Sequence, residues 1–523
     1  MPSEVQSDFD IDYACAGSGR KRTRHGKFDA AWKVLFYLRW PELTEHLPYD
    51  PLAGKNVMEC ESINDWRQKY WEMHVQNCFD AAAERAMLPS FDGRIGEIIV
   101  PDALIKAIGF QKKCSVYVYS RLHDHCQGFG AYTRFLRLPN VFCNVETCHL
   151  LTNSRLQGLL VRRICSKMHV DGLCKILYQN RETITSLQFV NCNISLDFFD
   201  AICDALAMED SPIHGVKHFA VRSSKLIESN PVSLPPKLVS FLSSGSLESL
   251  SFCDDRIGRN YAKLTLMTIL DTSSALSTLD LSDNNISGWL SDFRFKSVNR
   301  PSLSREMSSS LQSLRVLNLR GNNLCKNDME DLRCALVHMP VLEILDLADN
   351  PIQDEGIKSL IPWFVQTVEH VPLVNLILKN CDLSCSGASE LLEVLLELKY
   401  PLTSLSLADN DLGSQIAPSL GDFLRSSIKS LDVRDISLGS SGFLELRINV
   451  PHIMNLVSIN ISENRGGIQA AEFLGELISK ASELLTVHAG YNLMPPESLN
   501  IICSALKIAK GTQINEYFCK YLS

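Results

Sequence analysis

An internal repeat is the feature that most constrains the fold of this chain. A phrase of the form L-x-x-L-x-L-x-x-N/C-x-L occurs eleven times, and successive copies start 26 to 32 residues apart, with one interval of 38. Self-similarity at a nearly fixed period predicts a solenoid, in which each unit buries its apolar face against its neighbours. The copies start at Ile184, Val216, Leu247, Leu276, Leu314, Leu342, Leu373, Leu402, Ile428, Leu456 and Leu484.

Each copy predicts the same local structure. The alternating L-x-L predicts a short strand whose leucines face inward, and an Asn at the ninth position can bond to backbone groups where the chain turns. Between copies, as in residues 354–368 and 386–398, the apolar residues change to helical spacing. Strand and helix therefore alternate. The ninth position is held by Asn284, Asn322, Asn350, Asn410, Asn464 and Asn492, and by Cys192 and Cys381 in two copies.

These phrases resemble the ribonuclease-inhibitor-like leucine-rich repeats, whose units are about 28 to 29 residues long with a full helix on the outer face. The resemblance implies an α/β leucine-rich repeat solenoid, a horseshoe with a concave parallel sheet and outer helices. We expect about eleven to twelve repeats over residues 156–523, including a degenerate first unit at 156–183. The long interval contains a polar insertion at 291–310, either a docking or phosphorylation loop or an inert insertion.

Acidic residues gather at the strand positions that should border the concave face. If they are exposed together, they form a negative surface suited to a basic or Lys-rich segment of a protein partner. The alternative is that Asp is used there for turn chemistry alone. The acidic residues are Asp254, Asp280, Asp283, Asp346, Asp349, Asp409, Asp432, Asp435 and Glu463, and the sparser cations are Arg222, Arg320, Lys379 and Arg434.

The N-terminal part lacks the repeat phrases and predicts a different structure. Residues 1–27 are expected to form a disordered tail, and residues 28–108 a small helical module that contains four of the six Trp residues. A basic cluster in the tail is either a nuclear import signal or a solvated stretch. The cluster consists of Arg20, Lys21, Arg22 and Arg24, and the bulky residues of the module are Trp32, Leu35, Phe36, Trp40, Trp66 and Tyr70.

The spacing of those bulky residues partly resembles the segment that follows the F-box in F-box proteins, or the related elongin-A-type helical region. The resemblance implies a Skp1- or elongin-C-like adaptor on residues 28–108, and hence a substrate-recognition subunit of a cullin-type ubiquitin ligase. The leading half of an F-box, a Leu-Pro phrase before an apolar helix, does not occur before Phe28. The alternative is that the aromatic residues simply form a core.

Residues 109–155 are expected to connect the helical module to the solenoid, with a strand at residues 116–120. Potential zinc ligands are dense in this segment. Their spacing lacks the paired C-x-x-C pattern of structural zinc sites, and we therefore predict packed Cys and exposed His without a metal. The residues are Cys114, His123, His125, Cys126, Cys143, Cys148 and His149.

Composition and motif searches narrow the function class. The formal charge of −9 disfavours broad binding to nucleic acid or to an anionic membrane. The polar N-terminus and the absence of a long apolar run predict an intracellular protein, cytoplasmic or nuclear, whose 18 Cys are reduced. Nucleotide-binding, kinase and hydrolase motifs are missing, so no enzyme activity, cofactor or small-molecule substrate is expected. We predict a protein-interaction protein: either the ligase subunit or a scaffold or regulator unrelated to ubiquitination.

Overall fold

The computed structural model divides into two compact units, Met1–Leu187 (unit 1) and Gln188–Ser523 (unit 2). We describe each unit by itself. The structure describes residues 25–41, 65–86, 97–100, 118–145, 148–208, 214–226, 231–270, 275–291, 311–367, 372–452 and 454–508.

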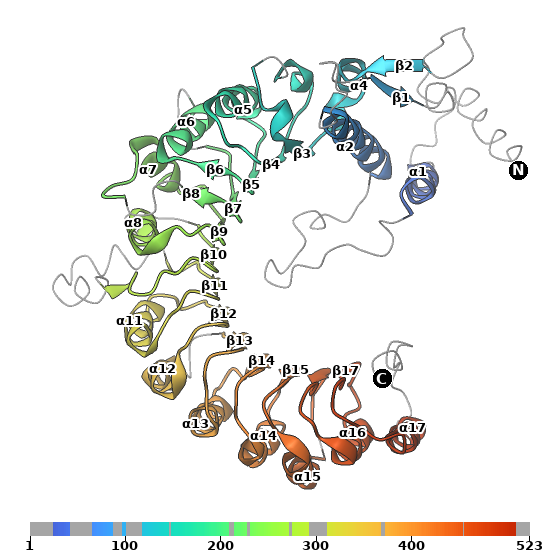
Figure 1. The fold of residues 1–523 in the computed structure, drawn as a ribbon, viewed down its shortest axis with the longest axis vertical. Helices are drawn as coiled ribbons and strands as arrows, with labels where there is room; N and C mark the ends of the chain where they lie inside the picture. The colour runs from blue at the N-terminus through green and yellow to red at the C-terminus, as the bar shows by residue number, and fades with distance from the viewer. Residues whose placement is uncertain are drawn as a thin grey trace, which may run out of the picture. The chain divides into compact units, whose positions relative to one another are not determined.

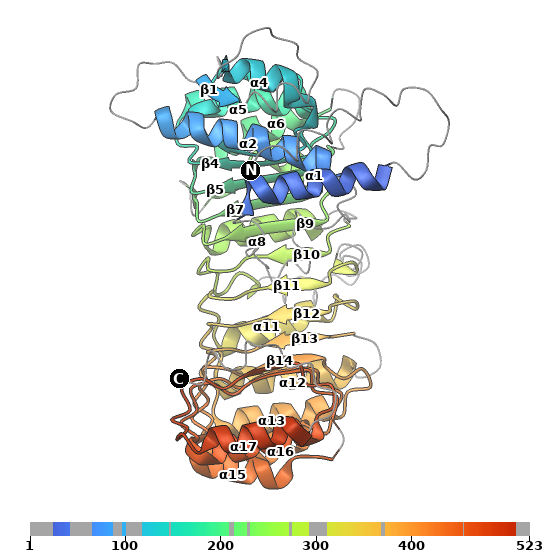
Figure 2. The ribbon, with the colours of Figure 1, turned by 90° about the vertical axis from the view of Figure 1, so that its right-hand side faces the viewer.

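Unit 2 is built around a parallel sheet whose strands follow one another in sequence order. The labelled strands follow one another along the sheet (Figure 2). Each pairs with the next in register, so that Leu279 lies beside Leu317 and Leu317 beside Leu345. This confirms the expected solenoid strands. After β5 (Ser186–Val190), which contains the unit boundary, they are β7 (His218–Arg222), β9 (Ser249–Cys253), β10 (Thr278–Asp280), β11 (Val316–Asn318), β12 (Ile344–Asp346), β13 (Asn375–Ile377), β14 (Ser404–Ser406), β15 (Ser430–Asp432), β16 (Ser458–Asn460) and β17 (Thr486–His488).

Helices cover the outer side of this strand row, and the strands line its concave side (Figure 1). The α/β leucine-rich repeat fold class is thereby confirmed. A short parallel pair, β6 (Asn193–Ile194) and β8 (Lys225–Leu226), lies apart from the main sheet. The helices are α6 (Leu196–Leu206), α7 (Pro236–Leu242), α8 (Gly258–Leu270), α11 (Lys326–Leu336), α12 (Gln353–Thr367), α13 (Cys385–Leu396), α14 (Ala417–Phe423), α15 (Gly439–Asn449), α16 (Gly467–Lys480) and α17 (Ser498–Ile508), with the 3₁₀ turn η6 (Ser414–Ile416).

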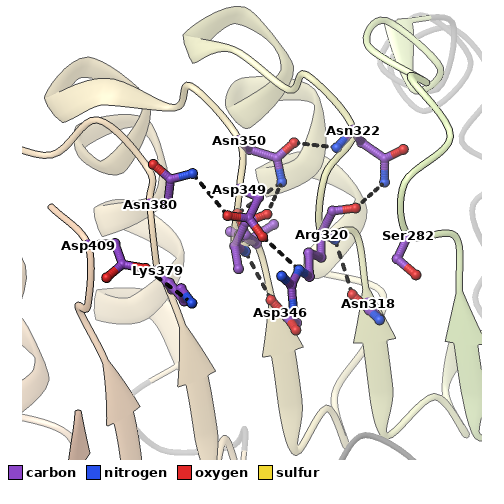
Figure 3. Close-up of polar contacts among 12 residues, drawn as sticks. Ser282, Asn318, Arg320, Asn322, Asp346, Asp349, Asn350, Lys379, Asn380 and Asp409 are labelled. Atoms are coloured by element: carbon purple, nitrogen blue, oxygen red, sulfur yellow. Dashed lines mark hydrogen bonds and ion pairs between the residues drawn. The ribbon is translucent and has the colours of Figure 1, made fainter. Parts of the chain in front are cut away.

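Buried Asn side chains connect the turns of neighbouring repeats, as the sequence predicts. Nδ2 of Asn350 donates to the carbonyl oxygens of Leu319 (3.0 Å) and Leu347 (2.9 Å), and its Oδ1 accepts from the backbone of Asn322 (2.9 Å). Each Asn therefore satisfies backbone groups in two repeats at once (Figure 3). Sγ of Cys381 donates to the Leu347 carbonyl at 3.2 Å, so the predicted structural role of this Cys is confirmed.

Three repeats carry neither Asn nor Cys at the ninth position, which the sequence analysis did not identify. Ser224, Asp255 and Ile436 occupy the ninth position of their phrases. Asp255 is fully buried, and its Oδ1 accepts from the backbone of Ser224 at 2.7 Å. Its Oδ2 has no hydrogen-bond partner in the described part of the chain. Burial raises the pKa of Asp255 to about 7.

Unit 1 holds the helical module and the first parallel strands. The parallel pairing begins at β3 (Phe135–Pro139), which lies inside the segment expected to be a connection (109–155) and pairs in register with β4 (Gly158–Arg162). The inward Leu136 and Leu138 are fully buried like repeat leucines, but no full repeat phrase marks them. The elements are α1 (His25–Arg39), α2 (Trp66–Ala86), the antiparallel pair β1 (Glu97–Val100) and β2 (Val118–Arg121), α4 (Leu122–Phe129), η3 (Gly130–Tyr132), β3 (Phe135–Pro139), η4 (Asn140–Phe142), η5 (Cys148–Leu151), β4 (Gly158–Arg162) and α5 (Lys167–Asn180).

Helix α2 packs on the outer edge of β3 through polar side chains. Oε2 of Glu72 accepts from the backbone N–H groups of Arg134 (2.8 Å) and Phe135 (2.9 Å). One turn later Gln76 bonds to the backbone of Arg137. Burial raises the pKa of Glu72, although the two backbone donors oppose the shift. Helix α2 of the predicted helical module therefore caps β3, the first strand of the parallel sheet.

Candidate functional site

The acidic residues predicted for the concave face of unit 2 form two rows. The strand row contains the residues that end β10, β12 and β15, namely Asp280, Asp346 and Asp432. The turn row follows the strands in a left-handed backbone conformation, with φ between +48° and +63°. Asn and Asp tolerate this conformation best among residues with a side chain, which explains part of the acidic pattern. The turn row contains Asp254, Asp283, Asp349, Asp409, Asp435 and Glu463, and Asn191 and Asn380 in other repeats.

Cations pair with three acids of the turn row toward the C-terminus, while Asp435 makes no ion pair within 4.0 Å among the described residues. Each cation pairs with the acid of the following repeat: Arg320 with Asp349 at 2.7 Å and Lys379 with Asp409 at 3.1 Å (Figure 3). In the same way Arg434 contacts Glu463 at 2.9 Å. The expected continuous negative stripe is therefore interrupted by ion pairs, because the seventh position of one repeat reaches the eighth position of the next.

Three carboxylates near β9 and β10 have no such counterion. Asp254, Asp280 and Asp283 make no ion pair within 4.0 Å among the described residues, and we call them the acidic cluster. Asp254 and Asp283 are exposed, and Asp280 is half-buried. The carboxylate of Asp283 occupies the space beside Gly321, where a Cβ atom would overlap it.

The electrostatics of Asp283 reflect its crowded surroundings. Partial burial raises the pKa of Asp283, while the Arg320 guanidinium opposes the shift. The carboxylates of Asp254, Asp349 and Asp280 raise it further. A cation brought to this cluster would relieve that repulsion.

Asp346 is not available to a partner, contrary to the prediction. It is only 3% exposed, and its Oδ1 accepts from the backbone of Ala348 at 2.9 Å. Burial raises its pKa to about 6. The other two residues of the strand row are half-buried and accept from serine hydroxyls, Asp280 from Ser251 and Asp432 from Ser406, each at 3.2 Å. Arg222 ends β7 and is half-buried.

The residues predicted to bind an adaptor lie mainly between α1 and α2 of unit 1. Phe36, Trp66 and Tyr70 are buried, and Trp32, Leu35 and Trp40 are half-buried. The Trp32 and Trp40 rings each lie 5.2 Å from that of Tyr70. These side chains form a core, the alternative that the sequence left open.

Two further predictions lie outside the described residues. The basic cluster at Arg20, Lys21, Arg22 and Arg24 precedes α1, and its role in nuclear import stays a prediction. Most of the insertion at 291–310 is likewise not described. Within the described residues, no helix is long and apolar enough to cross a membrane.

The Cys and His residues of segment 109–155 do not form one cluster among the described residues. Cys143 and Cys148 donate to the carbonyl oxygens of Pro139 and Val145, and the His123 ring lies 5.7 Å from that of His149. The structure does not describe Cys114. His125 and Cys126 instead lie on α4 and are buried, and His125 contacts the buried His74 of α2. The sequence analysis missed His74 and Cys78 because both lie outside the segment, and His74 is 51 residues before His125.

Comparison with known proteins agrees with the repeat geometry. Two leucine-rich repeat family models match residues 338–360 and 275–294. The ribonuclease inhibitor of Sus scrofa is 26% identical over 242 residues, which are 45% of this chain and 50% of that protein. The NACHT, LRR and PYD domains-containing protein 2 of Homo sapiens is 28% identical over 37% of this chain and 18% of its own length. This chain thus spans at most about half the length of these relatives.

Among solved structures, that of the TLR13–ssRNA13 complex aligns with 74% of this chain and 56% of the other chain. The sequence identity is 16% and the TM-score is 0.34.

Proposed function

We propose that this leucine-rich repeat protein, whose repeats are of the ribonuclease-inhibitor-like type, is a non-enzymatic protein that binds another protein on the concave face of unit 2. The observation that carries the proposal is the acidic cluster, Asp254, Asp280 and Asp283. These carboxylates lie on two neighbouring repeats and make no ion pair within 4.0 Å among the described residues, although the Arg320 guanidinium acts on Asp283 from a longer distance. Uncompensated like charges on an accessible surface favour a partner of opposite charge.

The spacing of the cluster favours an extended polypeptide over a small molecule. Neighbouring strands of a sheet lie about 4.8 Å apart, so the carboxylates of successive repeats form a row along the sheet. Lys or Arg side chains of a bound segment can contact several of them at once. Negative charge also disfavours the phosphates of nucleic acid.

The ion pairs nearer the C-terminus predict a different contribution from that half of the face. Asp349, Asp409 and Glu463 already have cationic neighbours, so a basic partner gains less from them. The name of the Sus scrofa relative, ribonuclease inhibitor, states a protein target for that molecule. This supports a protein partner here and leaves its identity to experiment.

Neutralisation without a change of shape tests the proposal. We suggest the triple variant Asp254→Asn, Asp280→Asn, Asp283→Asn. Asn already occupies the turn row at Asn191 and Asn380, and the strand-row position of Asp280 at Asn318 and Asn460, so the backbone conformation is retained. Asp435→Asn is the matched control, because it makes the same change in the same row outside the cluster.

The probe is a fluorescent Lys-rich peptide whose binding is followed by anisotropy at low and physiological salt. Exposed charge pairs contribute about 0.2–1 kcal/mol each, so the triple variant should bind roughly tenfold more weakly and the control nearly as wild type. Equal binding by the wild-type protein and the triple variant would show that the acidic cluster does not bind the basic peptide.

The ubiquitin-ligase role is a second candidate, favoured by one observation. Val34 and Leu38 of α1 are 58% and 73% exposed, an apolar face that the packing against α2 does not use. A Skp1- or elongin-C-like adaptor on this face would need these two residues. Co-purification of the adaptor with the wild-type chain and its loss with Val34→Ser, Leu38→Ser would support the role, whereas no adaptor with either chain would discard it.

A further inference from the structure

We propose that unit 1 contains a zinc site whose ligands are His74, Cys78 and His125. Each of these side chains is at most 2% exposed. Their ligand atoms all lie within 4.8 Å of one another. The site is separate from the concave face of unit 2, and it differs from the set suggested by the spacing within residues 109–155.

Two of the three distances between ligand atoms match the edges of a zinc tetrahedron, and the third is within 4.8 Å. Nε2 of His74 lies 3.1 Å from Nδ1 of His125, and Sγ of Cys78 lies 3.7 Å from the same Nε2. Zinc bonds of about 2.0–2.1 Å to nitrogen and about 2.3 Å to sulfur require edges of roughly 3.3 Å between nitrogens and 3.6 Å between nitrogen and sulfur. Both distances agree within a few tenths of an ångström.

Two helices hold these ligands in place. His74 and Cys78 are four residues apart and share one face of α2, while His125 lies on α4. The Trp71 and Phe129 rings stack between the same helices, with centroids 4.2 Å apart. This aromatic stack packs α2 against α4 beside the ligands, which suits a structural metal site that joins the two helices.

Cys126 is the candidate for the fourth ligand, but its side chain would have to turn toward the other three, because its Sγ is not among the atoms that all lie within 4.8 Å of one another. It follows His125 on α4 and is 2% exposed. Two imidazoles and two thiolates are a ligand set that selects zinc over harder cations such as magnesium or calcium. With Cys126 the site is closed and structural, and with a water in the fourth position it is open.

Metal binding at His74 requires that Arg39 give up its hydrogen bond to the His74 ring. Nη2 of Arg39 lies 3.0 Å from Nδ1 of His74, and its Nη1 donates to the Tyr70 hydroxyl at 2.9 Å. An imidazole that accepts at Nδ1 carries its proton on Nε2, so the metal-free His74 donates to His125. When zinc binds Nε2, that proton moves to Nδ1 and the Arg39 guanidinium turns away, while each ligating thiol releases its proton to solvent.

The experiment uses the full chain, purified without a polyhistidine tag. Elemental analysis should find about one zinc per chain. Replacement by Co²⁺ should produce a thiolate-to-metal absorption band. Cys78→Ala should abolish this band, or weaken it where Cys126 supplies a second thiolate, whereas Cys143→Ala, another buried Cys of unit 1, should retain it in full. Zinc well below one per chain together with no Co²⁺ band would overturn the proposal and leave a hydrogen-bonded pair of buried histidines.

X-ray absorption on the zinc-loaded wild-type protein keeps the test independent of whether Cys78→Ala folds. Nitrogen at about 2.0 Å and sulfur at about 2.3 Å in the first shell support the site, and a second sulfur assigns Cys126. A shell of oxygen and nitrogen alone would contradict it. Arg39→Met removes the competing donor and should bind zinc at least as tightly as wild type, whereas weaker binding would contradict ligation through Nε2 of His74.

Discussion

The side-chain amide of Gln76 forms two hydrogen bonds with the backbone of Arg137. Its Oε1 accepts from the N–H at 2.7 Å, and its Nε2 donates to the carbonyl oxygen at 3.0 Å. Gln76 thus supplies the donor and acceptor that a further strand would offer to β3. An unpaired strand edge is open to pairing with other chains, and solenoids need a polar cap at their ends. Helix α2 provides such a cap in unit 1.

Replacement of this amide should destabilise unit 1. Gln76 is only 5% exposed, so Gln76→Ala leaves the N–H and carbonyl of Arg137 without these partners and should cost about 1–3 kcal/mol in unfolding free energy. Gln127→Ala, at an exposed position of α4, should change it by less than about 0.5 kcal/mol. Urea unfolding followed by Trp fluorescence measures both, and equal effects would contradict the cap.

Asp255 should make stability depend on pH. Its folded pKa of about 7 lies above the usual value of 3.8, so the folded chain keeps the proton that the unfolded chain loses. This contribution is fully present below about pH 4 and is lost as pH rises through 7. Asp255→Asn supplies an amide donor, as Asn284 does, and should stabilise the protein by about 1–3 kcal/mol at pH 8 but less at pH 5.

The reciprocal change is the control for that prediction. Asn284 is 1% exposed, and its Nδ2 donates to the carbonyl oxygens of Phe252 and Leu281. Asn284→Asp should therefore destabilise more at pH 8 than at pH 5. Chemical unfolding at the two pH values decides, and a pH-independent gain in Asp255→Asn would show that its proton is not involved.

At the ninth position of a repeat, replacement of Asn by Cys should lower the unfolding free energy less than replacement by Ala. Asn350→Ala removes the amide that serves Leu319, Leu347 and Asn322, and should cost about 2–4 kcal/mol. Asn350→Cys should cost less, because Sγ of Cys381 reaches the equivalent carbonyl of its neighbouring repeat. Thermal unfolding of the two variants tests the order, and a Cys variant as unstable as the Ala variant would refute the equivalence.

Removal of Arg320 should strengthen binding of a basic partner without much effect on stability. The Arg320–Asp349 pair is partly exposed, so Arg320→Gln should change the unfolding free energy by less than about 1 kcal/mol. The same variant adds negative potential beside Asp283. Anisotropy with the Lys-rich peptide should show severalfold tighter binding, and weaker binding would mean that Arg320 contacts the partner directly.

Sequence periodicity predicted the repeats because strand and turn positions are local. Leu279 and Leu281, Asn284 and the helical spacing that follows all lie within one unit. β3 was missed because only Leu136 and Leu138 carry its signal, without the Asn or a regular interval. Asp255 and Ile436 were overlooked at a position that six Asn residues dominate.

The candidate site was only partly predictable. An exposed carboxylate can bind a partner, whereas a buried one bonds to the backbone. The sequence alone does not show that Asp283 is exposed and that Asp346 is buried. The ion pairs of Arg320, Lys379 and Arg434 join residues of adjacent repeats, so they depend on register. The His74–His125 contact joins residues 51 positions apart, beyond the reach of motif spacing.

The most direct test of the account is quantitative mass spectrometry of the proteins retained by the immobilised wild-type chain, by the triple Asn variant of the acidic cluster and by Asp435→Asn. We predict that a protein with a Lys- or Arg-rich segment is retained by the wild-type chain and by Asp435→Asn but is lost from the triple variant. Retention of the same proteins by all three chains would contradict recognition through Asp254, Asp280 and Asp283.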